Sequence, residues 1–181
     1  AMAKCKGNLA GIGATLEGFD CNPYIYEYVF EKAWNFPTNR NVQEWVNALA
    51  DQRTGKVDAN ARQAWQLLVD SIYNQQTVTQ QRQPFFNMRP AFMTSNMVRQ
   101  IPQVDKEDKI LLEVIEKLLQ VDSDRQSYHF DLANLTRQLL TNHFMSVFYD
   151  YQKAYEAKDL QTMRLLAKKM TTIIEDLDKV V

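Results

Sequence analysis

Residues 11–27 hold the side chains of this sequence whose types and spacing could do chemistry. Four of the chain's five glycines fall within the first eighteen residues, and the apolar stretch that they interrupt carries a carboxylate at Glu17. Because glycine permits positive φ and close backbone approach, such a stretch is suited to bringing an acid to the rim of a site. Asn22 and Pro23 have the types preferred at the N-cap and the first position of a helix. These residues therefore suggest a strand that ends at a glutamate and is followed by a turn and a helix. In (β/α) barrels, catalytic groups lie at such strand ends.

The spacing of these residues also resembles a known enzyme family. Read from Gly11, Gly-x-Gly-x-x-x-Glu-Gly-x-x-x-Asn-Pro-x-x-Tyr-Glu is similar to the end of the catalytic barrel in α-N-acetylglucosaminidases, glycoside hydrolase family 89. Leu16 stands where members of the family often carry Met, which is an exchange between apolar residues. Blocks that resemble the helical region after that barrel follow in order at residues 44–46, 64–68, 71–74, 89–90 and 128–138. The resemblance covers nearly the whole chain, from Leu9 to the end.

The resemblance implies a function and a role for Glu17. It implies a retaining exo-glycosidase that hydrolyses terminal α-linked N-acetylglucosamine without a cofactor, with a glycan as its substrate and Glu17 as the nucleophile. Such enzymes place two carboxyl groups roughly 5–5.5 Å apart, and the second, the acid/base, would lie earlier in the barrel, outside this chain. We therefore expect the 181-residue chain by itself to be inactive. Without the resemblance, a single glutamate in a glycine-rich turn is more simply a solvated turn residue.

Three residues after Glu17 have both a binding and a structural interpretation. Asn22 can act as a helix cap alone, or it can also contact a sugar hydroxyl from a loop at the barrel rim. Tyr24 and Tyr26 can stack on pyranose rings in a substrate pocket, or they can be core residues between the helices and the barrel. The sequence leaves both interpretations open at each position.

Composition bounds the kinds of partner to expect. The formal net charge of −1 gives no reason to expect nucleic acid or an anionic membrane, and no apolar stretch approaches the ~20 residues of a membrane-spanning helix. Cys5 and Cys21 lack the Cys/His spacing of a metal site, and the sequence does not tell whether they pair. His129 and His143 lie about four turns apart on one predicted helix, too far to share a metal. The sequence indicates no compartment, whereas the resemblance implies a secreted, cell-envelope or lysosomal protein.

After Pro23 the sequence reads as successive helices. Apolar residues recur at three- and four-residue spacing between capping residues, which predicts helices over residues 23–34, 42–54, 59–72, 128–158 and 160–181. The same spacing predicts a further helix that includes residues 111–119. This spacing predicts an all-α fold, an antiparallel helical bundle preceded by a short Gly-rich strand or loop. The predicted core contains Trp45, Trp65, Leu68, Ile115, Leu135, Leu139 and Met170. Tyr151 and Tyr155 are also predicted to face inward from the long helix.

The predicted elements divide into two parts. We expect residues 1–22 to be the C-terminal end of the catalytic barrel, containing its last strand and site loop. We expect residues 23–181 to be an α-helical C-terminal domain that packs on the missing barrel. The apolar spacing of the last helix continues to Val181, and no residue that would cap the helix follows it. We therefore expect the chain to be a fragment that is cut at both ends.

Residues 75–104 form a long irregular tract that contains Pro84, Pro90 and Pro102. Loops beyond ~12–15 residues inside a domain are commonly functional, so the tract could be a lid across the barrel mouth. It could instead cross the surface, with apolar residues such as Phe92 inserted into the bundle. A second class of function also stays open, a stand-alone all-α interaction or scaffold module without catalytic activity, whose aromatic faces dock a partner protein.

Overall fold

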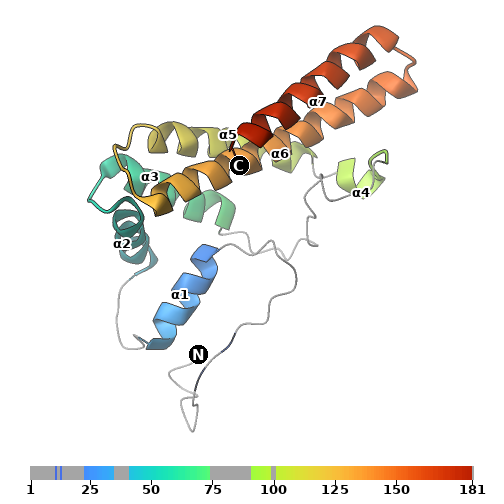
Figure 1. Ribbon diagram of the computed structural model, residues 1–181. Helices are drawn as coiled ribbons and strands as arrows, with labels where there is room; N and C mark the ends of the chain where they lie inside the picture. Colours follow the sequence, from blue (N-terminus) through green and yellow to red (C-terminus); the bar gives the residue numbers. More distant parts are fainter. Residues whose placement is uncertain are drawn as a thin grey trace. The chain divides into compact units, whose positions relative to one another are not determined.

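The computed structural model describes residues 11, 13, 23–34, 41–73, 91–98 and 101–180. All of the regular structure in these residues is helical, which confirms the predicted all-α fold (Figure 1). The chain divides into a first unit of residues 1–41 and 79–83 and a second unit of residues 42–78 and 84–181. The predicted strand before residue 22, and Glu17 and Asn22 with it, lies outside the described residues.

Helix α1 (Pro23–Trp34) belongs to the first unit and has the predicted bounds. Pro23 occupies its first position, where the helix does not need the missing N–H and where the fixed φ of proline suits the helix. Lys32 lies in the last turn, where a positive charge complements the negative end of the helix dipole. Along the helix, Tyr24 is buried whereas Ile25 and Phe30 are exposed.

Two short helices open the second unit, and their ends follow the local signals in the sequence. Helix α2 (Val42–Thr54) is followed by Gly55, whose φ of +73° is the left-handed conformation that ends many helices. The carboxylate of Asp58 then accepts two backbone N–H groups from the first turn of α3 (Ala59–Leu68). Glycine after a helix and aspartate before one are the residue types that these two positions favour. The chain continues beyond α3 through a π-helical turn, Val69–Tyr73, instead of a regular helix.

The longer helices of the second unit are α5 (Ile101–Leu118), α6 (Gln126–Glu156) and α7 (Leu160–Val180). Helices α5 and α6 run antiparallel. Near the start of α5, Asp105 accepts a hydrogen bond of 2.8 Å from the hydroxyl of Ser146, which lies late in α6. At the end of α5, the carbonyl of Leu118 accepts one of 2.8 Å from the hydroxyl of Tyr128, which lies early in α6. Helix α3 packs on α2 and α5, and α2 also contacts α6, so the predicted bundle is confirmed (Figure 1).

The main core of the second unit lies where these helices meet. Its largest fully buried side chains are Val46, Leu68, Val104, Val114 and Leu118. Most of the predicted core is buried as expected, namely Trp45, Trp65, Leu68, Ile115 and Leu135. Leu139 and Met170 were predicted to be core residues too, but each is only half-buried.

The C-terminal half of α6 extends beyond α5 and pairs with α7 (Figure 1). The 31 residues of α6 span ~46 Å, against ~27 Å for the 18 residues of α5. Phe144 and Val147 on α6 meet Ile173 on α7 in a second buried cluster. Partly buried apolar residues surround it, namely Leu140, Phe148, Leu166, Met170 and Leu177. Because two paired helices bury mainly the stripes that face each other, Met170 at the edge of this cluster stays half-buried.

A tight turn joins α6 to α7. Lys158 has a φ of +58°, and the N–H of Asp159 donates to the carbonyl of Ala154 at 2.9 Å, which closes the end of α6. The carboxylate of Asp159 then accepts hydrogen bonds from the backbone N–H of Thr162 at 3.0 Å and from its hydroxyl at 2.6 Å. Asp159 therefore caps the last helix, which begins at residue 160 as predicted.

The described part of the predicted irregular tract is more regular than expected. It contains the short helix α4 (Ser95–Val98), and α5 begins at Ile101, inside the tract that was predicted to be irregular as far as residue 104. The prediction was wrong because Pro102 suggested a loop, whereas proline is tolerated in the first turn of a helix.

Residues 91–98 of this tract pack on α6. Met93 is buried, and its N–H donates to the side chain of Gln152 at 2.7 Å. The ring of Phe92 lies on that of Tyr155, with 4.8 Å between the ring centroids. Both rings remain near the surface, and Tyr155, which was predicted to face inward, is 52% exposed. The buried Met93 agrees with the interpretation of a surface crossing held by apolar residues, whereas Phe92 is not inserted into the bundle as that interpretation expected.

Candidate functional site

Of the residues predicted for a site, Tyr24 and Tyr26 are described, and both lie on α1. Tyr24 is buried and Tyr26 is half-buried. The rings of Tyr26 and Phe30, one helical turn apart, stack with 6.4 Å between centroids and 27° between planes. The ammonium group of Lys32 lies 5.5 Å from the ring centroid of Tyr28. Helix α1 therefore carries aromatic rings that suit packing or the binding of a sugar face, but these rings supply no nucleophile for hydrolysis.

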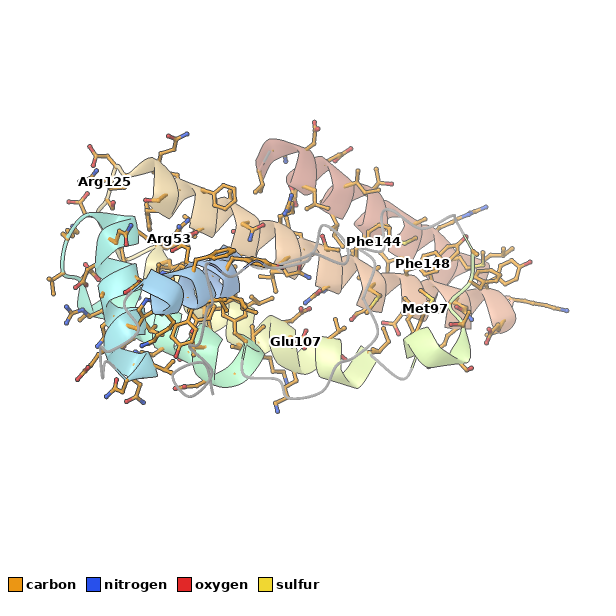
Figure 2. The ribbon with its side chains drawn as sticks, turned by 90° about the horizontal axis from the view of Figure 1, so that it is seen from below. Arg53, Met97, Glu107, Arg125, Phe144 and Phe148 are labelled. Atoms are coloured by element: carbon orange, nitrogen blue, oxygen red, sulfur yellow. The ribbon has the colours of Figure 1, made fainter. Side chains whose placement is uncertain are left out.

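A polar cluster that the sequence analysis missed lies between α5 and α6. The side-chain oxygen of Asn142 accepts a hydrogen bond of 2.8 Å from Gln138. Within the described residues, Asp108 Oδ1 and Asn142 Nδ2 are buried without a hydrogen-bond partner. Burial raises the pKa of Asp108 to about 6, against the opposing effect of the Asn142 amide. The negative charges of Asp105 and of Glu107, which Figure 2 labels on α5, raise this pKa further.

A signal for this cluster was present in the sequence. Val104, Asp108, Leu111 and Ile115 recur at spacings of four, three and four residues. If the helix is extended back to Ile101, Asp108 falls on its inward stripe. The sequence analysis assigned Val104 to the irregular tract, which interrupted this stripe and hid the pattern.

A partly buried ion pair joins α2 to α6. The guanidinium group of Arg53 donates to both carboxylate oxygens of Asp131, with one of the two bonds at 2.6 Å. It also lies 6.0 Å from the ring centroid of Trp65. Figure 2 shows Arg53 and Arg125 at the same end of the second unit, where the side chain of Arg125 covers Gly55. These contacts hold the end of α2 against the start of α6.

The histidines have separate surroundings in the second unit. The ring of His129 lies against that of Tyr128, with 5.2 Å between centroids. Burial and the nearby charge of Lys169 lower the pKa of His143, and Asp105 opposes this. In the described part of the chain, no group of three or more His, Cys, Asp or Glu side chains could hold a metal ion. No helix described here is long and apolar enough to cross a membrane.

Comparison with known proteins places these helices in a family. Residues 45–181 match the family described as "Alpha-N-acetylglucosaminidase (NAGLU) C-terminal domain". The alpha-N-acetylglucosaminidase of Homo sapiens is 25% identical over 162 residues, which cover 87% of this chain and 21% of the human protein. The chain thus spans about a fifth of the length of that relative, and no solved structure is significantly similar to it. The family match covers all but the first three residues of the second unit, so the chain belongs to the alpha-N-acetylglucosaminidase C-terminal domain family.

Proposed function

We propose that this chain is part of a glycosidase that releases terminal α-linked N-acetylglucosamine from glycans. The observation that carries the proposal is the family match over residues 45–181. The name of the human relative, with which the similarity extends over 87% of the chain, supports the same activity. In this proposal, residues 1–22 form the end of the catalytic barrel, and residues 23–181 form the helical domain that packs beside it.

Glu17 is the nucleophile in this proposal. It attacks the anomeric carbon, while an acid/base carboxyl elsewhere in the barrel protonates the leaving oxygen. Water then hydrolyses the glycosyl-enzyme, and the configuration of the sugar is retained. Asn22, Tyr24 and Tyr26 are proposed to contact the sugar, the asparagine through its amide and the tyrosines through their ring faces.

Helix α1 gives the helical part of the chain a role in placing Glu17. Glu17 precedes the first residue of α1, Pro23, by six positions, and six residues span at most ~20 Å of extended chain. The position of α1 therefore limits where Glu17 can lie. Proline in the first turn and the stack between Tyr26 and Phe30 favour a rigid helix at this point, which suits a group that must be held at the reacting carbon.

The test uses the complete protein that contains this chain and an aryl α-N-acetylglucosaminide as substrate. We expect Glu17→Ala to abolish turnover, because no other group can form the glycosyl-enzyme. Added azide should then enter the vacated space and attack from the face of the missing nucleophile, which gives the β-glycosyl azide. The α-azide would instead show that Glu17 is the acid/base, and full activity of the variant would remove it from catalysis.

Two controls make the result specific. Glu175→Ala removes an exposed glutamate from α7, outside the motif, and should leave turnover unchanged. The 181-residue chain alone should release no aryl alcohol, because retaining hydrolysis needs two positioned carboxyl groups. Absence of hydrolysis by the complete wild-type protein would contradict the proposed activity itself, whatever the role of Glu17.

A further inference from the structure

Helix α7 carries two rows of apolar residues, and α6 covers one of them. On the covered side, Ile173 is buried, and Leu166 and Leu177 are partly buried beside it. A second row of apolar residues recurs at spacings of three and four along the adjacent side of the helix. This row, the second seam, contains Leu160, Met163, Ala167, Met170, Ile174 and Leu177. Its residues occupy the a and d positions of three consecutive heptads, which is the pattern by which one helix packs along another.

The second seam is largely open to solvent. Leu160 is 67% exposed and Ile174 is 49% exposed, whereas Met163 and Ala167 are half-buried. Among the described helices, α6 is the one on which α7 packs extensively, along its extended half (Figure 1). Apolar residues that are exposed singly are ordinary on a protein surface. Apolar residues at successive heptad positions instead form a continuous stripe, which a helix buries against another element.

The charges beside the second seam have opposite signs at its two ends. Arg164 and Asp178 are exposed and occupy e positions two heptads apart, with Thr171 at the e position between them. Charged residues next to such a seam set the partner and the orientation of paired helices. When two copies of α7 lie antiparallel about a two-fold axis near Thr171, Arg164 of each copy faces Asp178 of the partner subunit. Two parallel copies would place equal charges at the same level, so the charges favour the antiparallel arrangement.

We propose that two copies of this chain associate through the second seam, with α7 antiparallel to the same helix of the partner subunit. Met170 then packs on Ile174 of the partner subunit, and Ala167 packs on Leu177 of the partner subunit. The two-fold axis repeats each of these contacts. The two pairs between Arg164 and Asp178 lie at the edge of this apolar contact, where solvent screens them. They therefore select the orientation more than they add affinity.

The experiment measures the mass of the 181-residue chain by sedimentation equilibrium. At about 100 μM, where a dimer with a micromolar Kd is nearly complete, we expect twice the 21.1 kDa of one chain. Ile174→Lys places a charge in the second seam and should give the mass of the monomer. Leu165→Lys is the matched control, because Leu165 is 68% exposed on the opposite side of α7, and the dimer should remain. Both substitutions are at exposed positions, so the helical circular dichroism signal should stay unchanged in each variant.

An exchange of charges tests the orientation and the identity of the partner helix. Arg164→Glu and Asp178→Arg should each raise the Kd of the dimer about tenfold, because each substitution creates two like-charge pairs across the axis. The double variant restores opposite charges and should recover the Kd of the wild-type chain. This recovery requires that both helices carry the exchange, so it identifies α7 of a second copy as the partner.

Three results would overturn the proposal. The first is a wild-type chain that stays monomeric at this concentration, which would assign the second seam to a different helix of the complete protein. The second is a dimer that responds equally to Ile174→Lys and Leu165→Lys, which would place the contact elsewhere. The third is a double charge variant that dissociates as readily as the single variants, which would exclude an antiparallel pair of α7 helices.

Discussion

Asp131→Ala should be among the most damaging single substitutions on α6, although Asp131 is remote from the proposed catalytic residue in sequence. The side chains of Arg53 and Asp131 are only 17% and 10% exposed, and two hydrogen bonds join them across 78 positions of sequence. Removing one partner of a buried ion pair costs ~3–5 kcal/mol, because the other charge stays buried and unpaired. Because part of the Arg53 side chain remains exposed, we expect a loss of about 3 kcal/mol, the lower end of that range.

Urea unfolding followed by the helical circular dichroism signal measures this loss. For a slope of about 2 kcal/mol per molar urea, the midpoint should fall by ~1.5 M. The matched control is Asp51→Ala, which breaks a pair of the same geometry between α2 and α3. Arg62 donates to the two oxygens of Asp51 at 2.8 and 2.5 Å, but these side chains are 36% and 23% exposed. Because solvent screens that pair, its loss should shift the midpoint much less.

A double variant separates the effect of an unpaired charge from the effect of lost packing. Arg53→Met combined with Asp131→Leu removes both charges and keeps most of the volume, so it should recover much of the stability lost in Asp131→Ala. If Asp131→Ala shifts the midpoint no more than Asp51→Ala does, the pair does not act as a buried one. If the double variant is no more stable than the single variant, the unpaired charge is not the cause of the loss.

Two further predictions concern the helix packing and the first turn of the second unit. Trp65→Ala should lower the free energy of unfolding by ~3–5 kcal/mol, because Trp65 is 6% exposed and its removal leaves a large cavity. Urea unfolding measures this loss, and a value below 1 kcal/mol would show that the surrounding side chains fill the cavity. Gly55→Ala should cost ~1–2 kcal/mol, because the φ of +73° strains any residue with a Cβ atom and that atom would overlap the side chain of Arg125. Adding Arg125→Ala should recover only the part due to the overlap, and complete recovery would mean that the backbone is not strained.

The sequence by itself determined the family, the fold class and the ends of several helices. Pro23, Gly55, Asp58 and Asp159 each act on backbone groups within a few residues of themselves, so their effects can be read locally. The spacing of apolar residues likewise identified buried positions such as Trp65, because the period of a helix fixes which residues share a face. The predicted roles of Glu17 and Asn22 depend on the family resemblance and stay predictions.

Tertiary structure alone decided the features that join distant parts of the chain. Nothing in the local sequence pairs Arg53 with Asp131, because only the packing of α2 on α6 removes both groups from water. Met170 has the spacing of a core residue, but α7 packs on the extended half of α6, where fewer helices are available to cover it. In the sequence, Asp108 is one of several charged residues in a polar stretch, but contact with α6 buries it and raises its pKa to about 6. The physical reason is the same in each case, since burial and charge pairing depend on which surfaces meet, whereas caps and periodicity depend on neighbours along the chain.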